Sequence, residues 1–293
     1  MREAARWLTV AAGNGAQLAV LPETINLLHR RDEAIPVETF AVERWQDETA
    51  VLCEAAARAK IALVLPLLVR DEGRLANRFY LLSKDGSSLG YYQKRVPAPG
   101  EQAAGVAVGK TRPLEWEGLK LGGAICIDVF FPGEVFDSQI EQGADLFVIP
   151  SYTPAGAVLD TNALVYGVPF VLAYSPWSRI LDRDGRELAA GGYRCETVRA
   201  GFASPIQQAT INFNAVTLFA DHNQDRMGDV ERHYGEKVRI RFDQHNCIFT
   251  LESRCAELAV EDVMREFGLI SRREYFANYH PDLRGGAKGA QAR

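Results

Sequence analysis

The sequence predicts an α/β protein in which two mixed sheets pack together with helices on the outside. Through residues 1–215, short β-rich apolar runs alternate with longer segments whose apolar residues return at helical spacing. Two Asp-Gly turns, within residues 84–87 and 183–186, predict hairpins because this dipeptide supplies the positive φ angles of a tight turn. Hairpins among βα-alternating segments indicate mixed sheets and argue against a TIM barrel or a plain doubly wound fold.

Each predicted strand is a short run of apolar and β-branched residues bounded by turn residues. In chain order, the predicted strands cover residues 17–21, 61–69, 77–83, 89–93, 119–126, 145–149, 169–174, 178–181 and 209–213. Each predicted helix is a longer segment with apolar residues at intervals of three and four. These helices cover residues 2–12, 37–60, 133–142 and 255–267.

The chain beyond residue 215 is expected to be less regular. Residues 221–235 are polar and turn-rich, which predicts a loop, and residues 285–293 form a Gly/Ala/Lys tail, which predicts disorder. No internal repeat or interdomain linker is visible, and a chain of 293 residues can form one large core. We therefore expect a single domain over residues 1–284.

Composition argues against several classes of partner and cofactor. A net charge of -5 and a pI near 5.7, without a basic stripe, argue against nucleic-acid binding. No run of eighteen apolar residues and no secretory-signal pattern is present, so we expect no membrane span and a cytoplasmic location. Five cysteines without close pairs indicate reduced thiols, and the histidines form no HExxH motif, so we expect neither a metal nor an organic cofactor.

The segment around Cys126 is the most informative for chemistry. An apolar predicted strand ends at Cys126, and a helix is expected to begin a few residues later. At such a corner the thiol is exposed, and helix-terminal amides favour the thiolate and can bind a developing oxyanion. This geometry suits a nucleophile, although a strand-ending cysteine is more often a small buried hydrophobe.

Two further predicted strands deliver a charged group at their carboxyl ends. The run Leu18-Ala19-Val20-Leu21-Pro22 leads to Glu23, and Tyr91-Tyr92-Gln93 leads to Lys94. The carboxyl ends of strands are where α/β sheets tend to place functional groups. Taken alone, each charge would be interpreted as an exposed residue at the end of a strand.

In the order Glu, Lys, Cys, these segments together resemble the nitrilase, or carbon-nitrogen hydrolase, superfamily. The matching pieces are Leu-Pro-Glu at 21–23, Tyr-x-Lys at 92–94, and Cys-x-Asp followed by proline at 126, 128 and 132. The flanks at 143–151 and 178–185 are also similar to the family's later strand and hairpin. The resemblance extends from about residue 5 to about residue 215, and no single motif carries it.

The resemblance implies an αββα sandwich that associates as a homodimer or larger homo-oligomer through its outer helices. It implies a catalytic triad of Glu23, Lys94 and Cys126, with the backbone N–H of Ile127 as a second oxyanion donor. Glu101 fits a supporting acid that orients the substrate or the lysine, its alternative being an exposed loop glutamate. No metal or organic cofactor takes part in this chemistry.

The sequence departs from the family pattern at two places. The family usually opens with a strand that carries a glutamine, followed by a helix, whereas Met1 falls inside that helix, so we expect the first strand to be missing. After the nucleophile, Phe130 replaces the common arginine and Gly133 is inserted before the glutamate. Cys126 is followed by Ile-Asp rather than by the Trp-Glu of nitrile-cleaving branches, which favours amides or carbamoyl compounds.

The expected function is therefore hydrolysis of a non-peptide C–N bond in a small amide or N-carbamoyl compound through a cysteine thioester. Two alternatives stay open: a nitrilase that releases acid and ammonia from a nitrile, and a catalytically silent nitrilase-like binding protein. Phe130, Tyr152 and Trp177 are candidate walls of the substrate pocket. The sequence does not identify the substrate.

Overall fold

The computed structural model of the chain describes residues 1–27, 35–192 and 205–279. Two compact units are present. The first comprises Met1–Ala163 and Val168–Ala209, and the second comprises Leu164–Gly167 and Thr210–Arg293. A single domain over residues 1–284 stays a prediction, and the predicted tail at 285–293 lies outside the described residues.

The first unit contains two sheets, both of mixed strand direction. One has the order β1 (Leu18–Val20), β2 (Ala62–Asp71), β3 (Arg74–Leu82) and β4 (Ser88–Gln93), with only β1 and β2 parallel. The other has the order β10 (Glu187–Gly191), β9 (Ser178–Leu181), β8 (Phe170–Ala173), β7 (Leu146–Pro150), β6 (Leu119–Gly123) and β5 (Leu114–Trp116). In that second sheet β6, β7 and β8 are parallel and the remaining neighbours are antiparallel.

The helices of the first unit are mostly short. They are α1 (Arg2–Gly13), α2 (Trp45–Glu48), α3 (Ala50–Ala59), α4 (Pro99–Ala103), α5 (Pro132–Val135), α6 (Asp137–Glu141) and α7 (Gly156–Tyr166), with 3-10 helices η1 (Val37–Phe40) and η2 (Cys126–Phe130). The last residues of α7 belong to the second unit.

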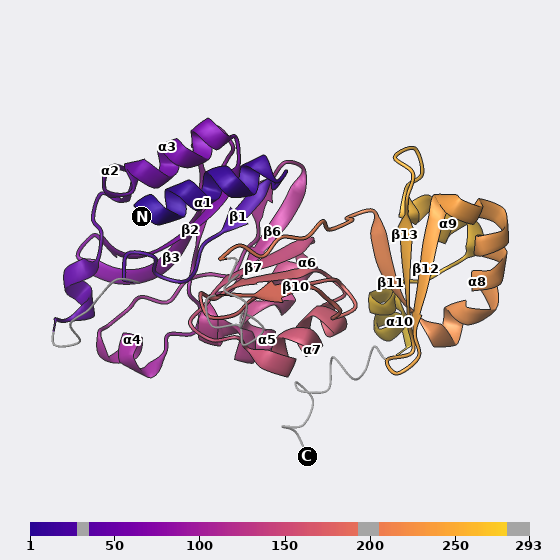
Figure 1. Ribbon diagram of the computed structural model, residues 1–293. Helices are drawn as coiled ribbons and strands as arrows, with labels where there is room; N and C mark the ends of the chain where they lie inside the picture. Colours follow the sequence, from indigo (N-terminus) through magenta and orange to yellow (C-terminus); the bar gives the residue numbers. More distant parts are fainter. Residues whose placement is uncertain (28–34, 193–204, 280–293) are drawn as a thin grey trace, which may run out of the picture. The chain divides into compact units, whose positions relative to one another are not determined.

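α1 and α3 cover the outer face of the first sheet and lie side by side in Figure 1. Leu8 of α1 and Leu52 of α3 share a buried cluster with Leu63, Leu65 and Leu67 of β2. Alternate residues of a strand point to opposite faces, so this odd-numbered set of β2 faces the helices. Burial of these leucines stabilises the layer by about 1.5–3 kcal/mol per side chain.

The inner faces of the two sheets meet at a glycine. A Cβ on Gly123 of β6 would lie 2.6 Å from Cγ of Tyr92 and 2.7 Å from Cζ of Phe79, so only glycine fits beneath these rings. On the second sheet, the ring of Phe136, between α5 and α6, packs edge-on against Phe147 of β7 with centroids 4.7 Å apart. Helix, sheet, sheet and helix layers confirm the predicted αββα sandwich.

The second unit is a three-stranded antiparallel sheet with helices. Its strands have the order β11 (Ala215–Phe219), β13 (Ile248–Ser253) and β12 (Val238–Asp243). Its helices are α8 (Ala220–Tyr234), η4 (Gly235–Lys237), α9 (Val260–Phe267) and α10 (Arg272–Tyr279). Leu218, Val230, Leu251 and Val263 are fully buried or nearly so and form its core.

The loop predicted for residues 221–235 is wrong, because this segment forms α8. The sequence of α8 is largely polar, but Ala220, Asn223, Met227 and Val230 make a narrow buried stripe along one side. Asn223 donates hydrogen bonds to the carbonyl oxygens of Phe219 and Ile270, so even the polar member of the stripe is satisfied. Tertiary packing therefore outweighs a weak amphipathic pattern.

Other element boundaries also differ from the prediction. Residues 209–213 form no strand, and the long helix predicted over residues 37–60 is divided into η1, α2 and α3. The last predicted helix begins at Val260 rather than at Cys255. No range was predicted for β5, β10, β11, β12, β13, α4, α7 or α10, and most of these elements are short and carry too few periodic residues to be recognised.

Candidate active site

The three residues of the predicted triad lie at the ends of three strands of the first unit. Glu23 follows β1 by three residues, Lys94 directly follows β4, and Cys126 begins η2 just after β6. Glu23 and Lys94 are each 2% exposed, so both charges are almost completely removed from water. Buried charges are rare unless they are paired, and these two are paired with each other.

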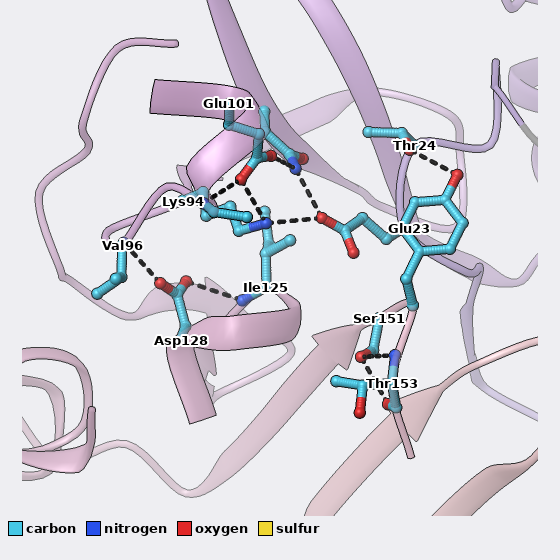
Figure 2. Close-up of polar contacts among 12 residues, drawn as sticks. Glu23, Thr24, Lys94, Val96, Glu101, Ile125, Asp128, Ser151 and Thr153 are labelled. Atoms are coloured by element: carbon cyan, nitrogen blue, oxygen red, sulfur yellow. Dashed lines mark hydrogen bonds and ion pairs between the residues drawn. The ribbon is translucent and has the colours of Figure 1, made fainter. Parts of the chain in front are cut away.

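Lys94 lies between two carboxylates (Figure 2). Its Nζ is 2.9 Å from Oε1 of Glu23 and 2.8 Å from Oε2 of Glu101. Burial lowers the pKa of Lys94, but the charges of Glu23 and Glu101 outweigh that effect, so the pKa of Lys94 is raised overall. Glu101 also accepts the N–H of Ala98 at 2.7 Å, which fixes it in the first turn of α4. The predicted supporting acid thus contacts the lysine and is not an exposed loop glutamate.

Asn77 of β3 joins the same cluster and was not predicted. Its Nδ2 donates to Oε1 of Glu23 at 2.8 Å and to Oε1 of Glu101 at 2.7 Å, and Asn77 is 1% exposed. One signal in the sequence could have revealed it. Asn77 stands two residues before Phe79, on the face of β3 that alternation assigns to the apolar interior, and a polar residue at such a position needs a buried partner.

Cys126 occupies the expected corner in a strained backbone conformation. Its φ is 52°, in the left-handed region that residues with a side chain rarely adopt and that often marks functional sites. Burial and the negative charge of Glu23 raise the pKa of Cys126 to about 11, against the opposing effects of Lys94 and the backbone N–H of Tyr152. The acidic thiol that the sequence led us to expect is therefore not found, because burial and the charge of Glu23 outweigh the effects of Lys94 and Tyr152.

The carboxylate of Asp128 connects the Cys126 corner with the chain after Lys94 (Figure 2). Asp128 is completely buried, and its Oδ2 accepts the N–H of Ile125 at 2.9 Å while Oδ1 accepts the N–H of Val96 at 2.7 Å. The hydroxyl of Tyr92 also donates to Oδ2 at 2.9 Å. Burial raises the pKa of Asp128 to about 6, although these donors act in the opposite direction.

The loop after β7 brings Tyr152 to the site. Its hydroxyl and Thr24 Oγ1 are hydrogen-bonded at 2.9 Å, and its backbone N–H reaches the Cys126 thiol. Ser151 Oγ accepts the N–H of Thr153 at 2.9 Å and donates to its carbonyl at 2.7 Å, which holds this loop in a turn. Tyr152 therefore lies beside both the thiol and the residue next to Glu23.

The remaining predicted residues are less closely tied to the cluster. Ile127 is half-buried in η2 directly after Cys126, and Phe130 is 46% exposed at the end of that helix. Trp177 lies in the turn between β8 and β9, where its backbone N–H donates to the carbonyl of Tyr174. No hydrogen bond found within the described ranges joins Phe130 or Trp177 to Glu23, Lys94 or Cys126.

Residues 1–27, 35–192 and 205–279 contain neither a cluster of metal-ligating side chains nor a membrane-spanning helix. No group of three or more His, Cys, Asp or Glu side chains there is arranged to hold a metal ion. No helix there is long and apolar enough to cross a membrane.

The sequence profile of one family, described as carbon-nitrogen hydrolase, matches residues 1–227. The chain belongs to the carbon-nitrogen hydrolase family. The match includes all residues of the buried cluster, and hydrolysis of a carbon–nitrogen bond is the class of activity that membership assigns. No curated protein matches the sequence of this carbon-nitrogen hydrolase at a significant level.

Solved structures of the same fold include two enzymes of related description. The carbon-nitrogen hydrolase from Helicobacter pylori G27 has a TM-score of 0.58 and 18% sequence identity, covering 79% of this chain and 86% of that one. A mutant of the amidase from Nesterenkonia sp. AN1, with acrylamide added at its active site cysteine, has a TM-score of 0.54 and 21% identity, covering 78% of this chain and 91% of that one. Another mutant of that amidase, in complex with butyramide, has a TM-score of 0.53 and 22% sequence identity. That match covers 78% of this chain and 88% of that one.

Proposed function

We propose that this carbon-nitrogen hydrolase cleaves the C–N bond of a small amide or N-carbamoyl compound through a thioester on Cys126. Glu23 would serve as the base, and Lys94 with the backbone N–H of Ile127 would bind the oxyanion. The observation that carries the proposal is the convergence of a buried carboxylate and a buried ammonium on the thiol at a strained corner. These are the groups that acyl transfer needs: nucleophile, base and anion stabiliser.

The first half of the reaction forms the thioester. Glu23 takes the proton from Sγ of Cys126 as the sulfur attacks the carbonyl carbon, and the negative charge that forms on oxygen is stabilised by the donors of Lys94 and Ile127. The tetrahedral intermediate then collapses. Its C–N bond breaks, Glu23 returns the proton to the departing nitrogen, and ammonia or an amine leaves.

The second half releases the acid. Glu23 takes a proton from a water molecule, and the oxygen of that water attacks the thioester carbon. When the second tetrahedral intermediate collapses, the C–S bond breaks and the sulfur recovers the proton from Glu23. One base therefore serves both halves.

The pKa of the thiol explains why a base is needed. With the pKa of Cys126 raised to about 11, the thiolate is scarce at neutral pH, and direct attack by a free thiolate would be slow. Oε2 of Glu23 is buried and accepts no hydrogen bond of normal geometry from the described residues, while Oε1 already accepts from Lys94 and Asn77. Oε2 is therefore the oxygen that would receive the thiol proton.

Three observations support small amides as the substrate class. The amidase from Nesterenkonia sp. AN1, which shares the fold, has been seen with butyramide and with acrylamide. Cys126 is followed by Ile-Asp and not by the Trp-Glu of nitrile-cleaving branches, and the backbone N–H of Tyr152 reaches the thiol, which makes this tyrosine a candidate wall of the substrate pocket. As part of the same proposal, we expect a cytoplasmic protein that forms a homodimer or larger homo-oligomer. Light scattering after gel filtration would test the oligomeric state.

The experiment is ammonia release by wild-type protein and Cys126→Ala from a panel of small amides, N-carbamoyl amino acids and nitriles. Cys53→Ala is the matched control. Cys53 is also a half-buried thiol, in α3, but the group beside it is the hydroxyl of Thr49 and not a carboxylate. Release from amides that is lost only in Cys126→Ala, with an acyl adduct on Cys126 by mass spectrometry, supports the proposal. Release from nitriles alone would make the protein a nitrilase, and no release by a folded protein would favour a binding role.

A further inference from the structure

Four side chains of the site form a closed ring of polar contacts. Lys94 Nζ contacts Glu23 and Glu101, and Asn77 Nδ2 donates to the same two carboxylates on the other side. The ring is tied to the backbone, since the N–H of Lys94 donates to the carbonyl of Asn77 at 2.9 Å. Within the ring, each of the two carboxylates thus has one charged and one neutral donor, and Glu101 also accepts the backbone N–H of Ala98.

The ring contains more negative than positive charge. Two carboxylates share a single ammonium, so their like charges repel each other across the ring. A donor that contacts both carboxylates compensates in part, because hydrogen bonds to a charged group are stronger than those between neutral groups. The amide nitrogen of asparagine carries two hydrogens, so one atom can serve both carboxylates, which neither aspartate nor leucine can do.

The orientation of the Asn77 amide follows from these partners. Its Oδ1 is buried and has no hydrogen-bond partner within the part of the chain that the structure describes. An unsatisfied buried acceptor costs about 1–3 kcal/mol, so the contacts made by Nδ2 must more than offset that cost. The orientation of the Asn77 amide is therefore fixed by the hydrogen bonds that Nδ2 donates to the carboxylates, and Oδ1 contributes none.

We propose that Asn77 is a positioning residue for the base in the proposed reaction, occupying Oε1 of Glu23 so that Oε2 is left for the proton of the Cys126 thiol. The role of Asn77 in catalysis rests on the proposed function, whereas the ring of contacts is observed independently of it. Asn77 touches no reacting atom in this scheme. It acts by fixing two carboxylates as acceptors around Lys94.

The charged and titratable groups that face Glu23 come from four elements. Lys94 follows β4, Glu101 lies in α4, Cys126 begins η2, and Tyr152 follows β7. Removing the Asn77 donor leaves only Lys94 to offset the repulsion between Glu23 and Glu101. The two carboxylates then repel each other with less compensation, and the position of Glu23 is less firmly fixed.

The test compares Asn77→Leu, which has a similar size and no donor, with Asn223→Leu as a matched control. Asn223 is equally buried in the second unit, but its Nδ2 donates only to the backbone oxygens of Phe219 and Ile270. For Asn77→Leu we expect kcat/KM for an amide to fall by roughly tenfold to a hundredfold, mainly through kcat. The acid limb of its pH profile should move to higher pH, because the repulsion between the two carboxylates is then less compensated.

A second readout needs no substrate. In urea unfolding between pH 4.5 and 8, the loss of stability in Asn77→Leu should grow as pH rises, because the lost donor matters only when both carboxylates are ionised. The loss in Asn223→Leu should not change with pH. Asn77→Ser, which keeps one donor and is smaller, should fall between wild type and Asn77→Leu, and it replaces Asn77→Leu if that variant does not fold.

The outcomes separate this inference from the proposed function. A stability loss in Asn77→Leu that is independent of pH, as in Asn223→Leu, would show a merely structural asparagine and overturn the inference. If the wild type hydrolyses no amide but the pH-dependent loss is found, the ring has the predicted role and the proposed substrate class is wrong. An unshifted acid limb in an active Asn77→Leu enzyme would also overturn the inference.

Discussion

The ammonium of Lys94 lies 2.9 Å from a carboxylate oxygen of Glu23, and each side chain is at most 3% exposed. A buried ion pair is costly to form but even more costly to break on one side, since the remaining charge loses its partner. The proposed base and the proposed oxyanion donor are therefore dependent on each other. Substitutions at one of them should change both stability and chemistry.

Lys94→Met should reduce both activity and stability. The buried carboxylate of Glu23 and the partly buried carboxylate of Glu101 would lose their cation, which costs about 3–5 kcal/mol in unfolding free energy, and loss of an oxyanion donor should lower kcat by roughly 10² to 10³. Urea unfolding and ammonia release measure the two effects. Lys84→Met is the control, because Lys84 pairs with Glu117 at 2.9 Å on the surface, with 64% of its side chain exposed. Equal stability of the two variants would contradict the buried pair.

Glu23→Gln should separate thiol reactivity from hydrolysis. The negative charge of Glu23 contributes to raising the pKa of Cys126, so removing it should lower that pKa and increase the thiolate fraction. We expect iodoacetamide to label Cys126 about three- to tenfold faster at pH 8 to 9, while amide hydrolysis is lost. Labelling is followed by mass spectrometry with Cys126→Ala as the blank. Slower labelling than in wild type would argue against this electrostatic account.

Asp128 should make stability depend on pH in a defined direction. Its pKa is raised by burial to about 6 from an ordinary value of 3.8, so the folded protein retains a proton that the unfolded chain releases. The associated stability is fully present below about pH 4 and is lost as pH rises through about 6, by about 3 kcal/mol in total. Urea unfolding from pH 4 to 8 should show this slope in wild type and a weaker one in Asp128→Asn. An unchanged slope would exclude Asp128 as its source.

Tyr152 should limit the size of the substrate. Its backbone N–H reaches the thiol, and its ring is anchored to Thr24 by the hydroxyl. Tyr152→Ala should raise the ratio of kcat/KM for butyramide over acetamide by roughly tenfold or more, since each additional methylene that a pocket accommodates is worth about 1–3 kcal/mol in discrimination. Tyr91→Ala, which removes a similarly exposed ring from β4, should leave this ratio unchanged. A ratio that does not respond to Tyr152→Ala would exclude the ring as a wall.

The sequence predicted the layers of the first unit better than its details. Continuous apolar runs such as residues 61–69 became buried strands, and both Asp-Gly turns joined antiparallel pairs, β3–β4 and β9–β10. The second unit was predicted poorly because α8 is polar and its buried stripe is narrow. Local pattern is informative where one face of an element is continuously apolar, and much less so elsewhere.

The sequence by itself determined which elements would present Glu23, Lys94 and Cys126, because an apolar strand followed by a charged or nucleophilic residue is a local pattern. Only the tertiary structure decided how those groups affect one another. The ring that includes Asn77 and Glu101, and the rise in the pKa of the Cys126 thiol, depend on burial and on charges brought together from separate strands. Electrostatic energies depend on distance and solvent exposure in three dimensions, and neither is encoded in local sequence.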